Sequence, residues 1–190
     1  MLICVRGIPG SGKTHLALKL RKLRGVMCVD ADDVVAGAYT AMAKTGTRFT
    51  IDDVYERAQK DMRVICGERG AGVTVVVGIT LAVPSPDATL FITMSPNVLK
   101  LAYERTVRRE LRKYASISPQ AIGKLHISQV APYLACKLHV NAFPPTRPFA
   151  AYAAEYATAL EFERKGGATL MSPRAILAHV RRCVVSRVRE

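Results

Sequence analysis

Residues 7 to 14 read Gly7-Ile8-Pro9-Gly10-Ser11-Gly12-Lys13-Thr14, and this stretch decides the expected fold class. It matches the pattern G-x-x-x-x-G-K-[ST] in full, which is typical of a loop that binds nucleotide phosphates. Its glycines let successive backbone N–H groups turn inward around phosphate oxygens, in conformations that a side chain would obstruct. The stretch lies between an expected strand, Leu2–Arg6, and an expected helix whose dipole adds positive potential. We therefore predict a nucleotide-phosphate site at this junction.

Two side chains of the motif are expected to act on the nucleotide directly. Lys13 should reach the β- and γ-phosphates, and the Thr14 hydroxyl should ligate Mg²⁺, so ATP and Mg²⁺ are the expected cofactors. The predicted nucleotide-binding residues here are Gly7, Pro9, Gly10, Ser11, Gly12, Lys13, Thr14 and His15. The motif alone does not distinguish an ATPase, a GTPase and a kinase.

The rest of the chain alternates short apolar runs with helical stretches, which is typical of an open, mainly parallel sheet. We predict a three-layer α/β P-loop NTPase fold, with a five-stranded, mainly parallel sheet flanked by helices. One domain should span residues 1–190, with a helical lid at about 105–150. The expected strands are 2–6, 26–30, 73–78, 89–94 and 168–171, and the expected helices are 13–24, 32–44, 51–66, 96–114, most of 118–165, and 173 to the C-terminus.

Local signals support several of these elements. Residues 73–78 read VTVVVG, a continuous β-branched run that predicts a central strand buried on both faces. Gly25 is expected to end the first helix. Thr50, followed three residues later by Asp53, predicts a helix N-cap.

The second strand ends in carboxylates, Val29-Asp30-Ala31-Asp32-Asp33, at the sheet edge where such folds bind ligands. The D-x-D spacing predicts that Asp30 and Asp32 lie on one side of the strand end. One of them could hold Mg²⁺ through water while the other contacts the acceptor hydroxyl as a base or orienter. Alternatively, these residues are a helix N-cap and first-turn acids, and Asp33 suits the capping role. The predicted metal ligands are Thr14 and Asp30, and the predicted catalytic residues are Lys13, Asp30, Asp32 and Arg109.

Four arginines follow the fourth expected strand at spacings of three and four, which places them on one helix face. They are Arg105, Arg108, Arg109 and Arg112. Facing a polyphosphate, they would neutralise charge on the transferring group. The alternative is a solvated basic face with acidic partners such as Glu104 and Glu110.

With these residues, the chain resembles the nucleoside-monophosphate-kinase-like group of P-loop kinases, which includes adenylate, cytidylate and shikimate kinases, with polynucleotide kinases nearby. The resemblance covers roughly residues 1–112 and the last strand and helix. It implies that Asp30 and Asp32 serve Mg²⁺ and the acceptor. It also implies that Arg105 stacks on adenine and that Arg109 grips the phosphates.

One further stretch agrees with this group, and one strand end departs from it. Residues 78–92, with their Pro86-Asp87-Ala88 link, look like the cytidylate-kinase arrangement. However, Gly78 and Ile79 stand where an acid or Gly-Arg is common, so no acidic Walker B residue is present there. On the acceptor side, Arg48 and Arg57 are candidates only.

Three functions therefore stay open. The first is a kinase for a nucleotide or another small hydroxyl or phosphate acceptor. The second is a polynucleotide 5′-hydroxyl kinase, which the net charge of +13, Arg48 and the arginines of the last helix favour. The third is a nucleotide-binding ATPase or regulatory module without kinase turnover, which the missing Walker B acid favours. The absence of tryptophan and an aromatic content of 6% count against a nucleic-acid stacking platform.

Composition sets the remaining expectations. Hydrophobic residues make up 49% and charged residues 23%, which is typical of a globular protein. The cysteines contain no C-x-x-C pair, which excludes a zinc ribbon and argues against a disulfide framework. No apolar run approaches the roughly 18 residues of a membrane span. We expect a cytoplasmic protein with a small-molecule phosphate acceptor, first a nucleotide, with nucleic acid as the other partner class and no membrane.

Overall fold

The computed structural model describes residues 1–46, 48–67, 72–78, 81–115 and 148–188. Its strands are β1 (Leu2–Arg6), β2 (Val26–Asp30), β3 (Val73–Val77), β4 (Ala88–Ile92) and β5 (Thr169–Met171). Its helices are α1 (Lys13–Leu20), α2 (Ala31–Ala43), α3 (Ile51–Gly67), α4 (Pro96–Ala115), α6 (Phe149–Lys165) and α7 (Pro173–Val188).

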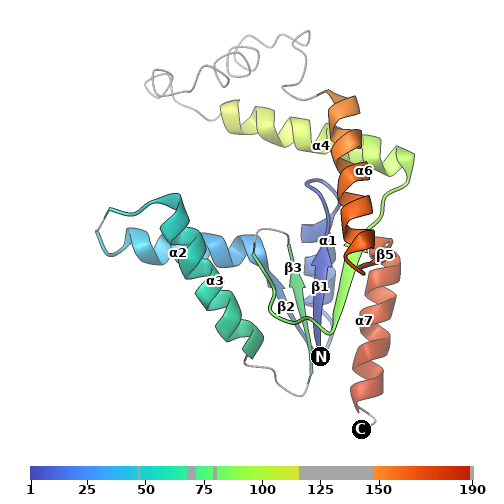
Figure 1. Ribbon diagram of the computed structural model, residues 1–190, viewed down its shortest axis with the longest axis horizontal. Helices are drawn as coiled ribbons and strands as arrows, with labels where there is room; N and C mark the ends of the chain where they lie inside the picture. Colours follow the sequence, from blue (N-terminus) through green and yellow to red (C-terminus); the bar gives the residue numbers. More distant parts are fainter. Residues whose placement is uncertain (47, 68–71, 79–80, 116–147, 189–190) are drawn as a thin grey trace. The chain divides into compact units, whose positions relative to one another are not determined.

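The five strands form one sheet in the order β2-β3-β1-β4-β5 (Figure 1). Every described pairing is parallel, so the predicted α/β sheet is confirmed and is parallel throughout this part of the chain. The run of Val73–Val77 forms β3, and all five of its residues are buried, as predicted. Because parallel strands end at the same edge, the loops after β1, β2 and β3 all begin there.

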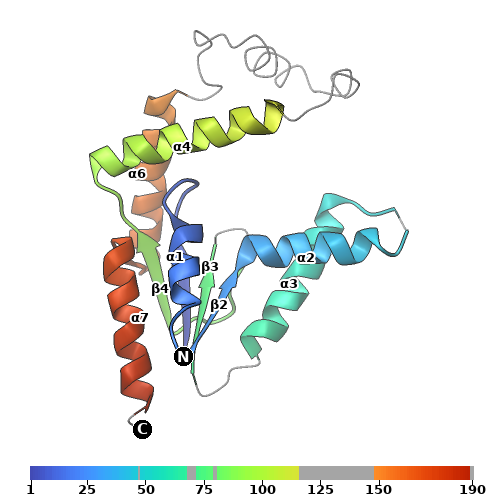
Figure 2. The ribbon, with the colours of Figure 1, turned by 180° about the vertical axis from the view of Figure 1, so that it is seen from behind.

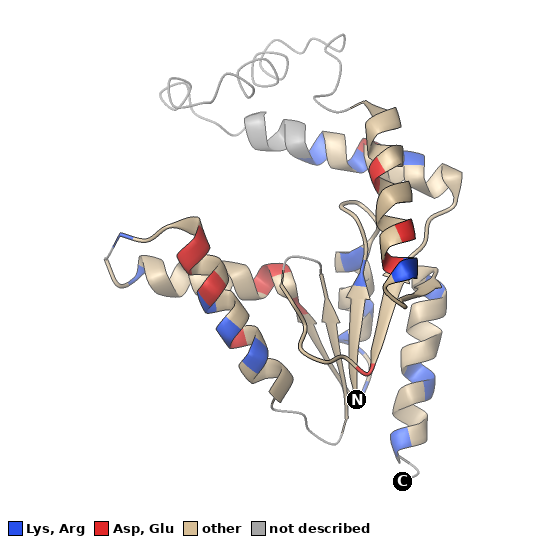
Figure 3. Cartoon of the chain, in the orientation of Figure 1, with Lys and Arg blue, Asp and Glu red and all other residues tan. Residues whose placement is uncertain are grey.

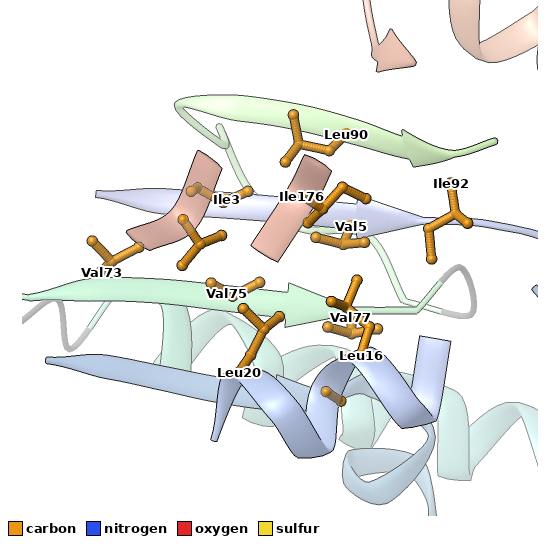
Figure 4. Packing of buried hydrophobic residues seen from close by; sticks show 12 residues of the cluster. Ile3, Val5, Leu16, Leu20, Val73, Val75, Val77, Leu90, Ile92 and Ile176 are labelled. Atoms are coloured by element: carbon orange, nitrogen blue, oxygen red, sulfur yellow. The ribbon is translucent and has the colours of Figure 1, made fainter. Parts of the chain in front are cut away.

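Helices cover both faces of the sheet. On one face, α1 and α7 pack on alternate strand residues, and Leu16 and Ile176 lie over Val5 and Val77 (Figure 4). On the other face, α2 and α3 cover Leu2 and Val76. Burial of a side chain of this size contributes about 1.5–3 kcal/mol. Strand residues that alternate between the two clusters therefore fix the register of the sheet.

Two helix termini differ in how well the sequence predicted them. Helix α3 begins as predicted, because the Thr50 hydroxyl accepts from the Asp53 amide at 3.2 Å and the Asp53 carboxylate accepts from the Thr50 amide at 2.7 Å. Helix α1 ends at Leu20, four residues before the predicted end at 24. The chain tightens there, since the Leu23 amide donates to the Leu20 carbonyl in an i→i+3 bond. Gly25, at φ 79°, therefore completes a turn into β2 and does not end the helix.

The chain divides into two compact units, residues Met1–Thr93 with Ala159–Glu190, and residues Met94–Thr158. The first unit holds the sheet with α1, α2, α3 and α7 (Figure 2). In the second, Tyr103 of α4 packs edge-on against Phe149, and the Met94 amide donates to the Tyr156 hydroxyl at 2.8 Å. Most of the predicted lid, about 105–150, lies outside the described residues. Within the described helices, none combines the length and apolar character needed to span a bilayer.

Candidate active site

The glycine-rich loop joins β1 to α1 at the carboxyl edge of the sheet (Figure 1). Gly10 and Gly12 have φ values of 82° and 90°, in the left-handed region that favours glycine. Gly7 is needed for space, because a Cβ there would lie 2.7 Å from Ser11 Oγ. The three glycines therefore allow a tight loop whose backbone approaches its own side chains closely.

Two side chains of the loop test whether it suits a phosphate. Ser11 is 5% exposed, and its hydroxyl is buried with no hydrogen-bond partner in the described structure. Lys13 Nζ donates to the carbonyls of Gly7 and Ile8, at 2.5 and 2.9 Å, so the ammonium group lies over the loop. The first turn of α1 contains no acidic residue. An orphan hydroxyl, a cation and a helix N-terminus without acids fit an anion of the phosphate type.

The other predicted loop residues lie at the surface of this junction. Thr14 and His15 are exposed in the first turn of α1, and Pro9 is partly exposed. The Thr14 hydroxyl is therefore accessible to a metal ion. Among the described residues, no group of three or more His, Cys, Asp or Glu gathers as a metal site.

Asp30 ends β2 and is buried, with 8% of its surface exposed. It faces Val77 across the sheet, and Val77 also faces Val5, so Asp30 lies level with Val5, two strand spacings or about 10 Å away. Burial raises the pKa of its carboxyl above the ordinary value, and the hydrogen bond from the Asp32 amide partly opposes that rise. Asp30 therefore lies near the phosphate loop in an environment that disfavours its charge.

The D-x-D prediction needs two corrections. Asp32 does not share a strand face with Asp30, because β2 ends at Asp30 and Asp32 is exposed in the first turn of α2. Asp30, and not Asp33, caps this helix: its Oδ1 accepts from the Asp32 amide at 3.1 Å. Asp33 instead pairs with Arg21 at 2.7 Å. Both Asp30 and Asp32 still lie at the carboxyl edge of the sheet.

Gly78 follows β3 at the position where the sequence lacks a Walker B acid, and close packing against α2 accounts for a glycine there. Gly78 has φ 147°, and a Cβ there would lie 2.5 Å from the Cβ of Ala31. The first turn of α2 thus occupies the space that an acidic side chain would need. The Pro-Asp-Ala link has a structural role at the opposite edge, where the Asp87 carboxylate accepts from the Leu2 amide at 2.7 Å.

A pocket of about 430 Å³ opens between α2 and α3, and Asp32 lines it. The other lining residues are Val35, Ala36, Tyr39, Thr40, Ile51, Val54 and Tyr55. The sequence analysis did not identify this pocket. A signal was present, because the α2 members recur at spacings of three and four and so share one helix face, as do the α3 members.

The arginine stripe lies on α4, in the second unit. Arg105, Arg108 and Arg109 are exposed, and Arg108 pairs loosely with Glu104 at 3.9 Å. The side chain of Arg112 is outside the described part of the helix. That pairing agrees with the solvated alternative for Arg108, while the roles predicted for Arg105 and Arg109 stay predictions.

Together, the parallel sheet and the glycine-rich loop between β1 and α1 define an α/β P-loop fold. No protein-family model matches the chain, and no curated protein sequence matches it. Among solved structures, it is similar to a gluconokinase from Sinorhizobium meliloti 1021, at 18% identity and a TM-score of 0.34, over 85% of this chain and 95% of that one. A likeness this remote does not transfer the gluconokinase's activity to this chain.

Proposed function

We propose that this protein is an ATP-dependent phosphotransferase that moves the γ-phosphate of ATP to a small acceptor carrying a hydroxyl group. The observation that carries the proposal is the placement of two kinds of group at one sheet edge. A phosphate loop with a buried orphan hydroxyl, Ser11, follows β1, and carboxylates follow β2 next to a pocket. An ATPase transfers the phosphoryl group to water, whereas a kinase also needs a site for its acceptor beside a carboxylate.

Each chain residue has a distinct part in this scheme. Bound Mg²⁺–ATP supplies the transferable phosphoryl group and neutralises part of its charge. Lys13 leaves the loop carbonyls and binds phosphate oxygens, and Ser11 donates its hydroxyl. Thr14 and Asp30 would hold the metal ion, Asp30 through water. Asp32, exposed at the mouth of the pocket, orients the acceptor hydroxyl and takes its proton.

The arginines of α4 complete the proposal. Arg105 and Arg109 are exposed and have no acidic partner within 4 Å among the described side chains, so both are available to an anion. We assign Arg105 to the adenine and Arg109 to the phosphates, as the kinase resemblance implies. Arg109→Ala should lower kcat by about 10²–10³-fold if this donor stabilises the transition state.

The experiment that tests the proposal measures phosphorylated product and ADP in parallel. The substrates are Mg²⁺–ATP with nucleosides, nucleoside monophosphates, hydroxylated metabolites and a 5′-hydroxyl oligonucleotide. Lys13→Ala should abolish both signals, whereas Lys19→Ala, an exposed lysine later on the same helix, should leave them unchanged. ADP release without any phosphorylated product would contradict the kinase function and favour an ATPase. Phosphorylation of the oligonucleotide alone would identify a polynucleotide kinase.

The carboxylates give a second test of the same chemistry. Asp32→Asn keeps the size of the side chain and loses its charge, so kcat should fall while the KM for ATP changes little. Asp30→Asn should raise the Mg²⁺ concentration needed for half-maximal rate. Full activity in both variants would remove these residues from the mechanism.

A further inference from the structure

The pocket between α2 and α3 carries chemical information about the acceptor, which the phosphate loop does not. We propose that this pocket binds an uncharged acceptor, a hydroxyl group on a flat aromatic body, and discriminates against acceptors that already carry a phosphate. The inference rests on the proposed phosphotransferase function. It departs from the expectation that a nucleotide is the first choice of acceptor.

The charges of the pocket are the first argument. Among the described residues, its lining contains one carboxylate, Asp32, and no lysine or arginine. Both flanking helices begin with acidic residues, Asp32 and Asp33 in α2 and Asp52 and Asp53 in α3 (Figure 3). Asp33 is paired with Arg21, so within the described lining the charge is that of Asp32, in a chain with a net charge of +13. A phosphorylated acceptor would meet like charge there without a cation to bind it.

The arginines considered for the acceptor side do not change this picture. Arg57 is engaged by Asp61, four residues along α3, at 3.1 Å. Arg48 is exposed and is not part of the pocket lining. Neither side chain therefore supplies the fork of donors that usually holds a phosphate group.

The polar groups of the lining are mainly hydrogen-bond acceptors. An ionised Asp32 only accepts. Thr40 already donates its hydroxyl hydrogen to the Ala36 carbonyl at 2.8 Å, which leaves only its lone pairs for a ligand. The phenols of Tyr39 and Tyr55 can donate or accept. A ligand with its own donors, such as a hydroxyl or amino group, matches this set better than an anion that needs donors.

The apolar part of the lining indicates a flat ring. Tyr39 and Tyr55 are 54% and 40% exposed, and Ile51 is 61% exposed, so three large side chains leave apolar surface open in one pocket. The ring of Tyr39 packs edge-on against Phe49, with centroids 5.5 Å apart, which holds it in place despite its exposure. A fixed aromatic ring favours stacking with another ring. A pocket of about 430 Å³ also lies in the size range of small organic ligands.

The transfer step then follows from the placement of Asp32. The acceptor oxygen forms a bond to the γ-phosphorus, and the bond from that phosphorus to the β–γ bridging oxygen breaks. ADP leaves with the electron pair, and the hydroxyl proton passes to the Asp32 carboxylate. The products are ADP and the phosphate monoester of the acceptor. A reaction that consumes this product would therefore belong to the class that acts on phosphate esters.

The test compares acceptors that differ only in one phosphate group. Adenosine is paired with AMP and thymidine with TMP, and gluconate serves as an anionic compound without a ring. Binding to the whole chain is measured by calorimetry without ATP, and product formation is measured with Mg²⁺–ATP. At least one nucleoside should bind about 10-fold more tightly than its monophosphate, and its kcat/KM should be higher by a similar factor.

Variants locate the effect in the pocket. Tyr39→Ala should weaken nucleoside binding by about 10-fold or more, while Tyr39→Phe should keep most of it. Val64→Ala, at an exposed α3 residue outside the lining, is the matched control and should behave like the parent. Thr40→Arg adds a cation to the lining and should reverse the preference toward the monophosphate. All three positions are exposed, so folding should be retained.

Separate measurements of binding and turnover distinguish the pocket proposal from the phosphotransferase function on which it rests. Nucleoside binding that Tyr39→Ala removes, without phosphorylated product, would contradict the phosphotransferase function and support the pocket. Tighter binding of the monophosphates or of gluconate by the parent chain would overturn the pocket proposal, even if transfer occurs. Absence of nucleoside binding, or binding that Tyr39→Ala leaves unchanged, would overturn it too.

Discussion

Gly78→Ala is the most direct test of how α2 meets the sheet edge. The added Cβ would lie 2.5 Å from the Cβ of Ala31, while the other Ala31 atoms near it are 3.5 Å or more away. Overpacking of this kind costs about 1–3 kcal/mol. The φ of 147° is strained for any side chain and adds about 1–2 kcal/mol. The variant should therefore lose about 2–5 kcal/mol of unfolding free energy.

Ala31→Gly separates these two terms. In that background, the only contact below 3.4 Å is removed, so the steric part of the cost disappears and the backbone strain stays. Urea unfolding of the parent, both single variants and the double variant gives the coupling energy, which should equal the steric term of about 1–3 kcal/mol in favour of the double variant. Gly67→Ala has open space around its Cβ and is the control. A Gly78→Ala variant within about 0.5 kcal/mol of the parent would refute the packing explanation for the missing acid.

Three further changes test other contacts by urea unfolding. Glu163→Gln breaks the 2.9 Å ion pair with Arg6, and because the Arg6 side chain is 34% exposed, the loss of unfolding free energy should be about 1–2 kcal/mol. Glu161→Gln, in the exposed pair with Lys165, is the control and should cost less than about 0.5 kcal/mol. Equal losses would contradict a larger contribution from the Arg6–Glu163 pair. Thr50→Ala should cost about 1 kcal/mol at neutral pH. The amide and the hydroxyl of Thr50 both lower the pKa of Asp53, and the substitution removes only the hydroxyl bond, so part of the cost should disappear as the pH falls below 3.8 through the folded-state pKa. A constant cost would contradict the bond from the Thr50 hydroxyl to the Asp53 carboxylate. The amide side chain that Asp30→Asn introduces can still cap α2. Because burial raises the Asp30 pKa above 3.8, the parent should lose stability relative to the variant as the pH rises through that folded-state pKa. A variant that is less stable than the parent at neutral pH would contradict the raised pKa of Asp30.

The sequence predicted those features that local chemistry determines. The glycine pattern predicted the loop, since left-handed φ values at Gly10 and Gly12 are a backbone requirement. The continuous valine run predicted β3, because a strand covered on both faces has no polar side. The Thr50 and Asp53 pair predicted the start of α3 for a similarly local reason.

Features that depend on how elements meet were harder to predict. The turn after Leu20 and the cap at Asp30 both depend on where the chain enters and leaves β2, which helical periodicity does not specify. The pocket needs the angle between α2 and α3, so the spacing of Tyr39 and Tyr55 indicated a shared apolar face only within each helix. The arginine stripe is local to α4, and its spacing does not specify what the side chains bind.

The position of the carboxylates explains why a complete phosphate loop occurs with no acid at the end of β3. Strands β2 and β3 are neighbours, and Asp30 faces Val77, the residue before Gly78. The Asp30 carboxylate therefore lies at the same edge of the sheet as Gly78, one strand spacing or about 5 Å away. Ala31 occupies the space that an acidic side chain at residue 78 would need. The helix turn that holds Ala31 also donates the Asp32 amide to Asp30. Under the proposed phosphotransferase function, Asp30 would serve Mg²⁺ in place of a Walker B acid, so Asp30→Asn, and not a change at Gly78, is the substitution that tests this role.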